Sequence, residues 1–120
     1  MAKDDYDVIV FKILTYLYAC IKRKIAFEDI TFMKTISFEN ISEEYLMDVL
    51  DMMQDEGLIT GYTSIKAWGG NLIRTSELSD LKITSKGIRY LNDNSKMKEV
   101  KNHLAENIGL VAELIKLAFM

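Results

Sequence analysis

Apolar side chains recur at helical spacing near the start of the chain, and they predict a helix from about Asp4 to Arg23. One stripe of this helix is apolar along its length: Val10, Ile13, Leu14, Leu17 and Ile21. Ile9, Tyr16 and Cys20 widen the stripe well beyond a single face. A helix that is apolar around most of its girth has to be covered on more than one side.

The next segments carry weaker and then stronger helix signals. Residues 27–34 predict a short helix, and a loop follows it. Ser42 can cap a further helix through its hydroxyl group, with acidic residues in the first turn. Apolar residues then recur at helical spacing: Leu46, Val49, Leu50 and Met53. Gly57 supplies the left-handed stop, so this helix is predicted over residues 42–56.

The period changes after Gly57. Residues 58–68 and 72–83 favour two strands, and Gly69-Gly70 allows the chain to reverse between them, which predicts a hairpin. Thr84 or Ser85 can cap a short helix that carries Ile88 and Leu91. From about Ser95 to the C-terminus the pattern predicts one long helix. No linker composition interrupts the chain, so we expect a single domain over residues 1–120, with a core of 1–94 and an added C-terminal helix of 95–120.

The order of these elements indicates the fold class. Three helices, a strand, a turn, a returning strand and further helix form the plan of a winged helix-turn-helix, an α+β fold that is mainly α. Four strings, "DEGLITG", "IKAWGGN", "ITSKGIRYL" and "NSKMK", together resemble the YjcQ family of small bacterial and prophage-encoded proteins. This resemblance covers essentially the whole chain. It implies a winged-helix fold and a bacterial or phage setting, and it assigns no catalytic or DNA-contacting residue.

Composition argues against an enzyme. Cys20 is the only cysteine and His103 the only histidine, so a disulfide framework, a cysteine-rich zinc site and a cluster of histidine ligands are all excluded. Glycine patterns that bind phosphates or dinucleotides are absent from the sequence. We therefore expect no catalytic residues, no metal, no cofactor and no small-molecule substrate.

The N-terminus and the first apolar segment bear on localisation. The chain begins with acidic residues instead of the basic lead-in of a signal peptide. Residues 8–21 are apolar, but Lys12 and Thr15 interrupt them and the segment is too short to span a bilayer. We expect a cytoplasmic protein without a membrane partner.

The helix over residues 42–56 has an acidic outer face. If its apolar stripe points inward, the outward positions are Glu43, Glu44, Met47, Asp48, Asp51, Gln54 and Asp55. Carboxylates near phosphates are repelled, and the net charge of −3 already weakens non-specific binding to DNA. This face is therefore either a solvated acidic surface or a site for a protein partner, for which the candidates are Glu43, Glu44, Asp48 and Asp51.

The hairpin has the opposite character. Lys66 and Arg74 flank a turn that contains Trp68, and such a combination could follow the phosphate backbone of duplex DNA or enter its minor groove. The alternative is that Trp68 packs back on the hairpin and that both cations are ordinary surface charges. If the protein binds nucleic acid, these three residues are the predicted contacts.

The C-terminal segment is unusually apolar. Its candidate interface residues are Leu104, Ile108, Val111, Leu114 and Ile115. The first predicted helix has a matching apolar surplus, so the two terminal helices should pack together, either within one chain or across the two-fold axis of a homodimer. We expect the homodimer.

Two functional hypotheses follow from the sequence. The first is a regulatory DNA-binding protein that uses the hairpin. The second is a protein-interaction module that uses the acidic helix 42–56 or the apolar C-terminal helix.

Overall fold

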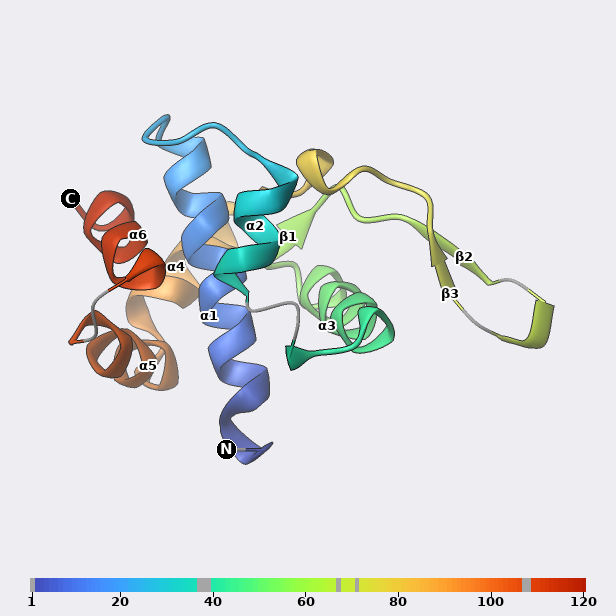
Figure 1. Ribbon diagram of the computed structural model, residues 1–120, viewed down its shortest axis with the longest axis horizontal. Helices are drawn as coiled ribbons and strands as arrows, with labels where there is room; N and C mark the ends of the chain where they lie inside the picture. Colours follow the sequence, from blue (N-terminus) through green and yellow to red (C-terminus); the bar gives the residue numbers. More distant parts are fainter. Residues whose placement is uncertain (1, 37–39, 67, 71, 107–108) are drawn as a thin grey trace.

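The computed structural model describes residues 2–36, 40–66, 68–70, 72–106 and 109–120 (Figure 1). Its helices are α1 (Ala2–Ile21), α2 (Asp29–Thr35), α3 (Glu43–Asp55), α4 (Ser85–Asp93), α5 (Ser95–Ala105) and α6 (Leu110–Ala118). Its strands are β1 (Ile59–Thr60), β2 (Ser64–Lys66), β3 (Leu72–Arg74) and β4 (Lys82–Ile83). The predicted α+β class, mainly helical, is confirmed. In the described ranges, none of the helices combines the length and the apolar character needed to cross a bilayer.

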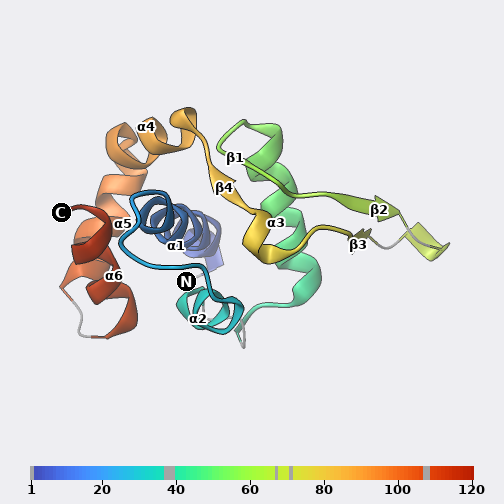
Figure 2. The same ribbon diagram turned by 90° about the horizontal axis from the view of Figure 1, so that it is seen from above.

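Helix α1 lies at the centre of the fold. It packs against each of the other five labelled helices and against β4 (Figures 1 and 2). Phe11, Ile13 and Leu14 are fully buried, and Tyr16 on another side of the same helix is also inaccessible to solvent. The prediction that this helix is covered on more than one side is therefore confirmed.

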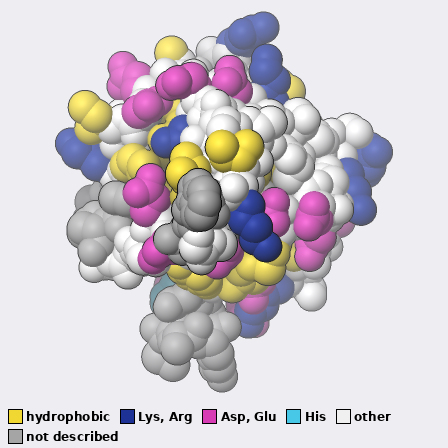
Figure 3. Space-filling view, turned by 90° about the vertical axis from the view of Figure 1, so that its right-hand side faces the viewer, with side chains coloured by type: hydrophobic (Ala, Val, Ile, Leu, Met, Phe, Trp, Pro, Cys, Tyr) yellow, Lys and Arg dark blue, Asp and Glu magenta, His cyan; other side chains and the backbone are white. Residues whose placement is uncertain are grey.

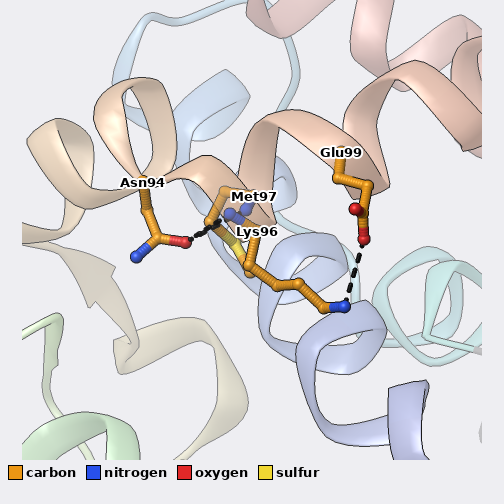
Figure 4. Close-up of polar contacts among 4 residues, drawn as sticks. All are labelled: Asn94, Lys96, Met97 and Glu99. Atoms are coloured by element: carbon orange, nitrogen blue, oxygen red, sulfur yellow. Dashed lines mark hydrogen bonds and ion pairs between the residues drawn. The ribbon is translucent and has the colours of Figure 1, made fainter.

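Local signals placed the starts of α3 and α4 and the end of α3 correctly. The Ser42 hydroxyl oxygen accepts a hydrogen bond from the Tyr45 amide at 3.0 Å, and Thr84 accepts one from the Gly87 amide at 2.9 Å. Gly57 ends the segment after α3 with a φ of 81°, the left-handed conformation that favours glycine. Asn94 caps the start of helix α5, since its side-chain oxygen accepts hydrogen bonds from the amides of Lys96 and Met97 (Figure 4).

The predicted hairpin is divided into two small sheets. Strands β1 and β4 pair at its base, with Ile59 opposite Ile83, and β2 and β3 pair toward its tip. Gly61 lies between the sheets with a φ of 92°, and a side chain there would overlap the carbonyl oxygen of Asp80. The chain crosses itself closely at this point, so the pairing is interrupted and only its outer part projects.

The prediction of one long C-terminal helix is wrong. The segment forms two helices, because α5 ends at Ala105 and α6 starts at Leu110. Gly109 precedes α6 with a φ of 139° and a ψ of −164°, a conformation that is essentially restricted to glycine. The reversal lets α6 fold back onto α1, which a continuous helix could not do.

Contacts of the last residues hold α6 on α1. The ring of Phe119 stacks with Phe11 at 6.4 Å between centroids, and Lys101 lies over the same Phe119 ring at 4.0 Å. The Lys22 ammonium group donates to the carbonyl oxygens of Ala118 at 2.8 Å and Met120 at 2.9 Å. Lys22 thereby satisfies carbonyl groups at the negative end of α6.

These contacts decide how the terminal helices pack. They meet within one chain: Leu114 and Ile115 are each 5% exposed, and Leu104 and Val111 are half-buried. The fifth predicted interface residue, Ile108, lies outside the described residues. The homodimer stays a prediction. Leu114 and Ile115 are buried within the chain, so they could contact a second copy only if α6 detached from α1.

Candidate functional site

A hairpin projects from one end of the molecule. We refer to residues 62–76, which contain β2 and β3, as the projecting hairpin. Both ribbon views show it extending away from the helices along the longest axis of the molecule, which measures 44 Å (Figures 1 and 2). It therefore presents its outer part to solvent on several sides.

The root of the projecting hairpin is fixed by Gln54 of α3. Its side-chain amide donates to the Tyr62 carbonyl oxygen at 2.7 Å, and its side-chain oxygen accepts from the Tyr62 amide at 2.8 Å. Gln54 was predicted to face solvent, and this part of the prediction is wrong because the hairpin root lies against α3. The two hydrogen bonds couple the direction of the hairpin to that helix.

Hydroxyl groups extend the pairing beyond the two strands. The Thr75 amide donates to the Thr63 carbonyl oxygen at 2.9 Å, and the two threonine hydroxyls lie 2.7 Å apart. The Thr63 amide donates to the hydroxyl oxygen of Ser76 at 3.0 Å. The projecting hairpin is thus paired from its root to β2 and β3.

One face of the projecting hairpin is apolar and exposed. Ile65 and Ile73 are opposite each other in the register, and 56% and 50% of their surfaces are exposed. Together they form a small exposed apolar patch. Our sequence reasoning missed this pair, although the alternation in "TSIK" and "LIRT" was the signal that could have found it.

The opposite face carries the predicted cations, and they differ from each other. Lys66 is exposed. Arg74 is half-buried, and its guanidinium group donates to the Ser76 carbonyl oxygen at 2.6 Å within the hairpin itself. The side chain of Trp68, the third predicted contact, lies outside the described part of the structure.

Helix α3, which carries the acidic residues, packs against β1 and β3 (Figure 2). Glu43, Glu44 and Asp48 are exposed as predicted, and Asp51 is half-buried. Met47, which was also predicted to face outward, is only 6% exposed, so that assignment is wrong. Seen from the hairpin end, the described residues mix acidic, basic and apolar side chains, and their Lys and Arg side chains do not form one continuous area (Figure 3).

The two residues with the most reactive side chains lie elsewhere. His103 is exposed on α5, and Cys20 is half-buried near the end of α1. Burial raises the pKa of the Cys20 thiol to about 11, so the thiol is protonated at neutral pH. Over the described residues, no three or more His, Cys, Asp and Glu side chains gather where they could hold a metal ion.

The comparisons with known proteins give one match. A family model with the description "YjcQ protein" matches residues 11–107, which run from α1 through α5. No curated protein and no solved structure matches this chain. The resemblance expected from the four sequence strings is confirmed.

Proposed function

This chain belongs to the YjcQ protein family, and we propose that it is a non-enzymatic winged-helix protein that binds duplex DNA and regulates transcription in a bacterial or prophage setting. The observation that carries the proposal is the projecting hairpin, which follows α3 in the chain and stands clear of the helices as a wing would (Figure 1). A fold does not by itself assign a function, and the side chains on the hairpin are what support DNA binding.

The chemistry of the hairpin suits the minor groove. Proteins that bind there combine cations with apolar side chains that insert between base steps. Lys66 supplies an exposed cation, and Ile65 and Ile73 supply an exposed apolar pair on the other face.

Helix α3 is proposed to contribute little to DNA binding. In the usual docking mode its exposed N-terminal residues would approach bases and phosphates. Here those residues include Glu43, Glu44 and Asp48, all exposed, and phosphates would repel them. The proposal therefore places the main contact on the projecting hairpin.

A salt-dependent titration tests this function. We expect the full chain to bind random duplex DNA at low salt and to lose affinity steeply as salt increases, measured by fluorescence anisotropy. Lys66→Ala should weaken binding to all sequences and reduce the salt slope by about one. Lys98→Ala, which removes an exposed cation from α5, is the matched control and should change neither quantity. Absence of binding even at low salt would rule out the proposal.

A protein-interaction module is the second candidate. It is favoured by the exposed carboxylates of Glu43, Glu44 and Asp48 in the N-terminal half of α3. The C-terminal helix is a weaker candidate surface, because Leu114 and Ile115 already pack inside the chain. If DNA does not bind, a protein retained from a host lysate by the wild type but not by a Glu44→Lys, Asp48→Lys variant would support this function.

A further inference from the structure

A groove lies apart from the projecting hairpin and from α3. It runs between the C-terminal end of α1, the loop of residues 22–28, and the segment 79–83 that leads into β4. Its volume is about 680 Å³, and it is open to solvent on one side. Figure 2 faces this side of the molecule, with α1 seen end-on and β4 beside it. Pockets for small ligands usually have volumes between about 300 and 1,000 Å³, so the size fits such a ligand.

The groove has an apolar lining. Leu17 and Leu81 are buried beneath it, and Phe27 is half-buried, with its ring edge-on to Tyr16 at 5.3 Å. Ile21 also lines the groove, and 49% of its surface is exposed. A ligand with an apolar body would remove that surface from water, and this is favourable.

The charged residues that line the groove all have the same sign. Arg23, Lys24 and Lys82 line it, each is exposed, and none of the lining residues in the described part of the chain is a carboxylate. The protein as a whole has a net charge of −3. The groove is therefore a locally positive concave surface on an acidic protein, and its charge complements an anion.

Arg23 occupies a backbone position that normally favours glycine. Its φ is 64°. It follows α1 in a hydrogen-bonding arrangement that ends many helices. The Lys24 amide donates to the Ala19 carbonyl oxygen at 3.0 Å, and the Arg23 amide donates to the Cys20 carbonyl oxygen at 3.0 Å. Glycine would adopt this conformation without steric cost. The chain thus has an arginine at the edge of the groove although the left-handed backbone at this position favours glycine.

We propose that this groove binds a small amphipathic monoanion, a straight-chain carboxylate whose tail covers Ile21 and Phe27 and whose head group lies among Arg23, Lys24 and Lys82. A peptide helix is a less suitable occupant, because a stable protein interface buries about 800 Å² on each partner and the lining comes from two short segments. The thiol of Cys20 also lines the groove and takes no chemical part. This is a bound ligand, independent of the proposed contact with DNA.

Three probes separate the contributions of tail and charge. Dodecanoate below its micelle concentration should bind the full chain at one saturable site, measured by calorimetry and by amide shifts in NMR spectra. Dodecyltrimethylammonium, which has the same tail and the opposite charge, should bind at least about tenfold more weakly. Acetate, which has the carboxylate without the tail, should show no binding.

Two variants test the site itself. Lys82→Ala should weaken dodecanoate binding several-fold. Arg23→Gly should also weaken it while the melting temperature stays the same or rises, because glycine relieves the left-handed backbone. A residue that served only to end α1 would not separate binding from stability in this way. Lys98→Ala is the control for loss of a distant positive charge.

Several results would overturn the proposal. Equal affinity for the two long-chain probes would show non-specific association of the tail. Dodecanoate binding that Arg23→Gly and Lys82→Ala both leave unchanged would place the anion elsewhere. Binding of an acidic peptide at the groove while dodecanoate fails to bind would identify a different class of partner.

Discussion

Gly87 illustrates how a single residue determines the packing of an element. A Cβ atom at this position would overlap the Leu58 carbonyl oxygen and would come within 2.8 Å of the Ile83 side chain. The same Leu58 oxygen accepts hydrogen bonds from the Thr84 amide and hydroxyl, each at 3.1 Å. Helix α4 therefore begins in direct contact with the backbone that leads into β1, and only glycine leaves room for it.

Replacing this glycine should destabilise the fold. Gly87→Ala should gain up to about 1 kcal/mol in helix propensity but lose about 2 kcal/mol or more through overpacking against Leu58. Urea denaturation should show a lower free energy of unfolding, while Asp93→Ala at an exposed position of the same helix should not. If Gly87→Ala proves as stable as the wild type, α4 does not depend on this close approach.

Cys20 provides a second residue-scale prediction. Burial raises its pKa from 9.0 to about 11, so its contribution to stability is complete below about pH 9 and is lost as the pH rises toward 11.

At pH 8 the fraction of Cys20 that is thiolate should be about a hundredfold lower in the folded protein than in the unfolded chain. Alkylation by iodoacetamide should be correspondingly slow and should keep accelerating up to pH 11. A native rate that levels off near pH 9 would contradict this, and the chain in urea is the control.

At the scale of elements, α3 shows how far a periodic pattern can predict burial. The predicted inward stripe is correct, because Leu46, Val49, Leu50 and Met53 are all buried. The outward face is only partly correct, since Met47 is buried and Gln54 bonds to Tyr62. A helix next to a hairpin is covered on two sides, and residues on α3 itself carry no signal of that second neighbour.

The acidic face of α3 should act as a barrier to DNA. Asp48→Asn with Asp51→Asn should raise affinity for duplex DNA about fivefold at low salt, from roughly 0.5 kcal/mol for each repulsion removed. High salt should abolish the gain through screening. Asp93→Asn with Glu106→Gln removes two carboxylates from α4 and from the end of α5, and this control should change affinity less. Equal effects of the two pairs would show that only net charge matters.

At the scale of the whole molecule, the main question is where the apolar surplus of the terminal helices is buried. The C-terminal helix α6 covers part of α1 within the chain, and Phe119 contacts Phe11 and Tyr18. A hydrophobic pattern indicates how much apolar surface must be buried. It does not indicate whether the same chain or a second copy covers that surface. The Lys22 contacts with Ala118 and Met120 belong to this packing and join residues far apart in the sequence.

Removing α6 should expose the surface that it covers. A chain that ends at residue 106 should have a larger average mass, relative to the mass of its own monomer, than the full chain has at the same concentration, because the face around Phe11 loses its cover. Light scattering at tens of micromolar measures this difference. An equal ratio of average mass to monomer mass for the two chains would mean that α6 does not shield α1 from self-association.

The sequence alone determined the features that depend on neighbours a few residues away. The helix starts at Ser42 and Thr84 rest on hydrogen bonds to amides three residues ahead, and the turn at Gly57 rests on its own φ angle. The same local strings carried the resemblance to the YjcQ family. The exclusion of a disulfide framework and of a cluster of histidine ligands likewise rests on residue counts, because Cys20 and His103 are each the only residue of their type.

Only the tertiary structure decided the features that join distant segments. It divided the predicted C-terminal helix into α5 and α6, brought Lys22 to the end of α6, and assembled the groove from residues 17–27 and 79–83. The physical reason is that hydrophobic periodicity shows which face of a segment is buried. It does not show which other segment packs against that face. That choice depends on shape and contact across the whole molecule, which no local pattern contains.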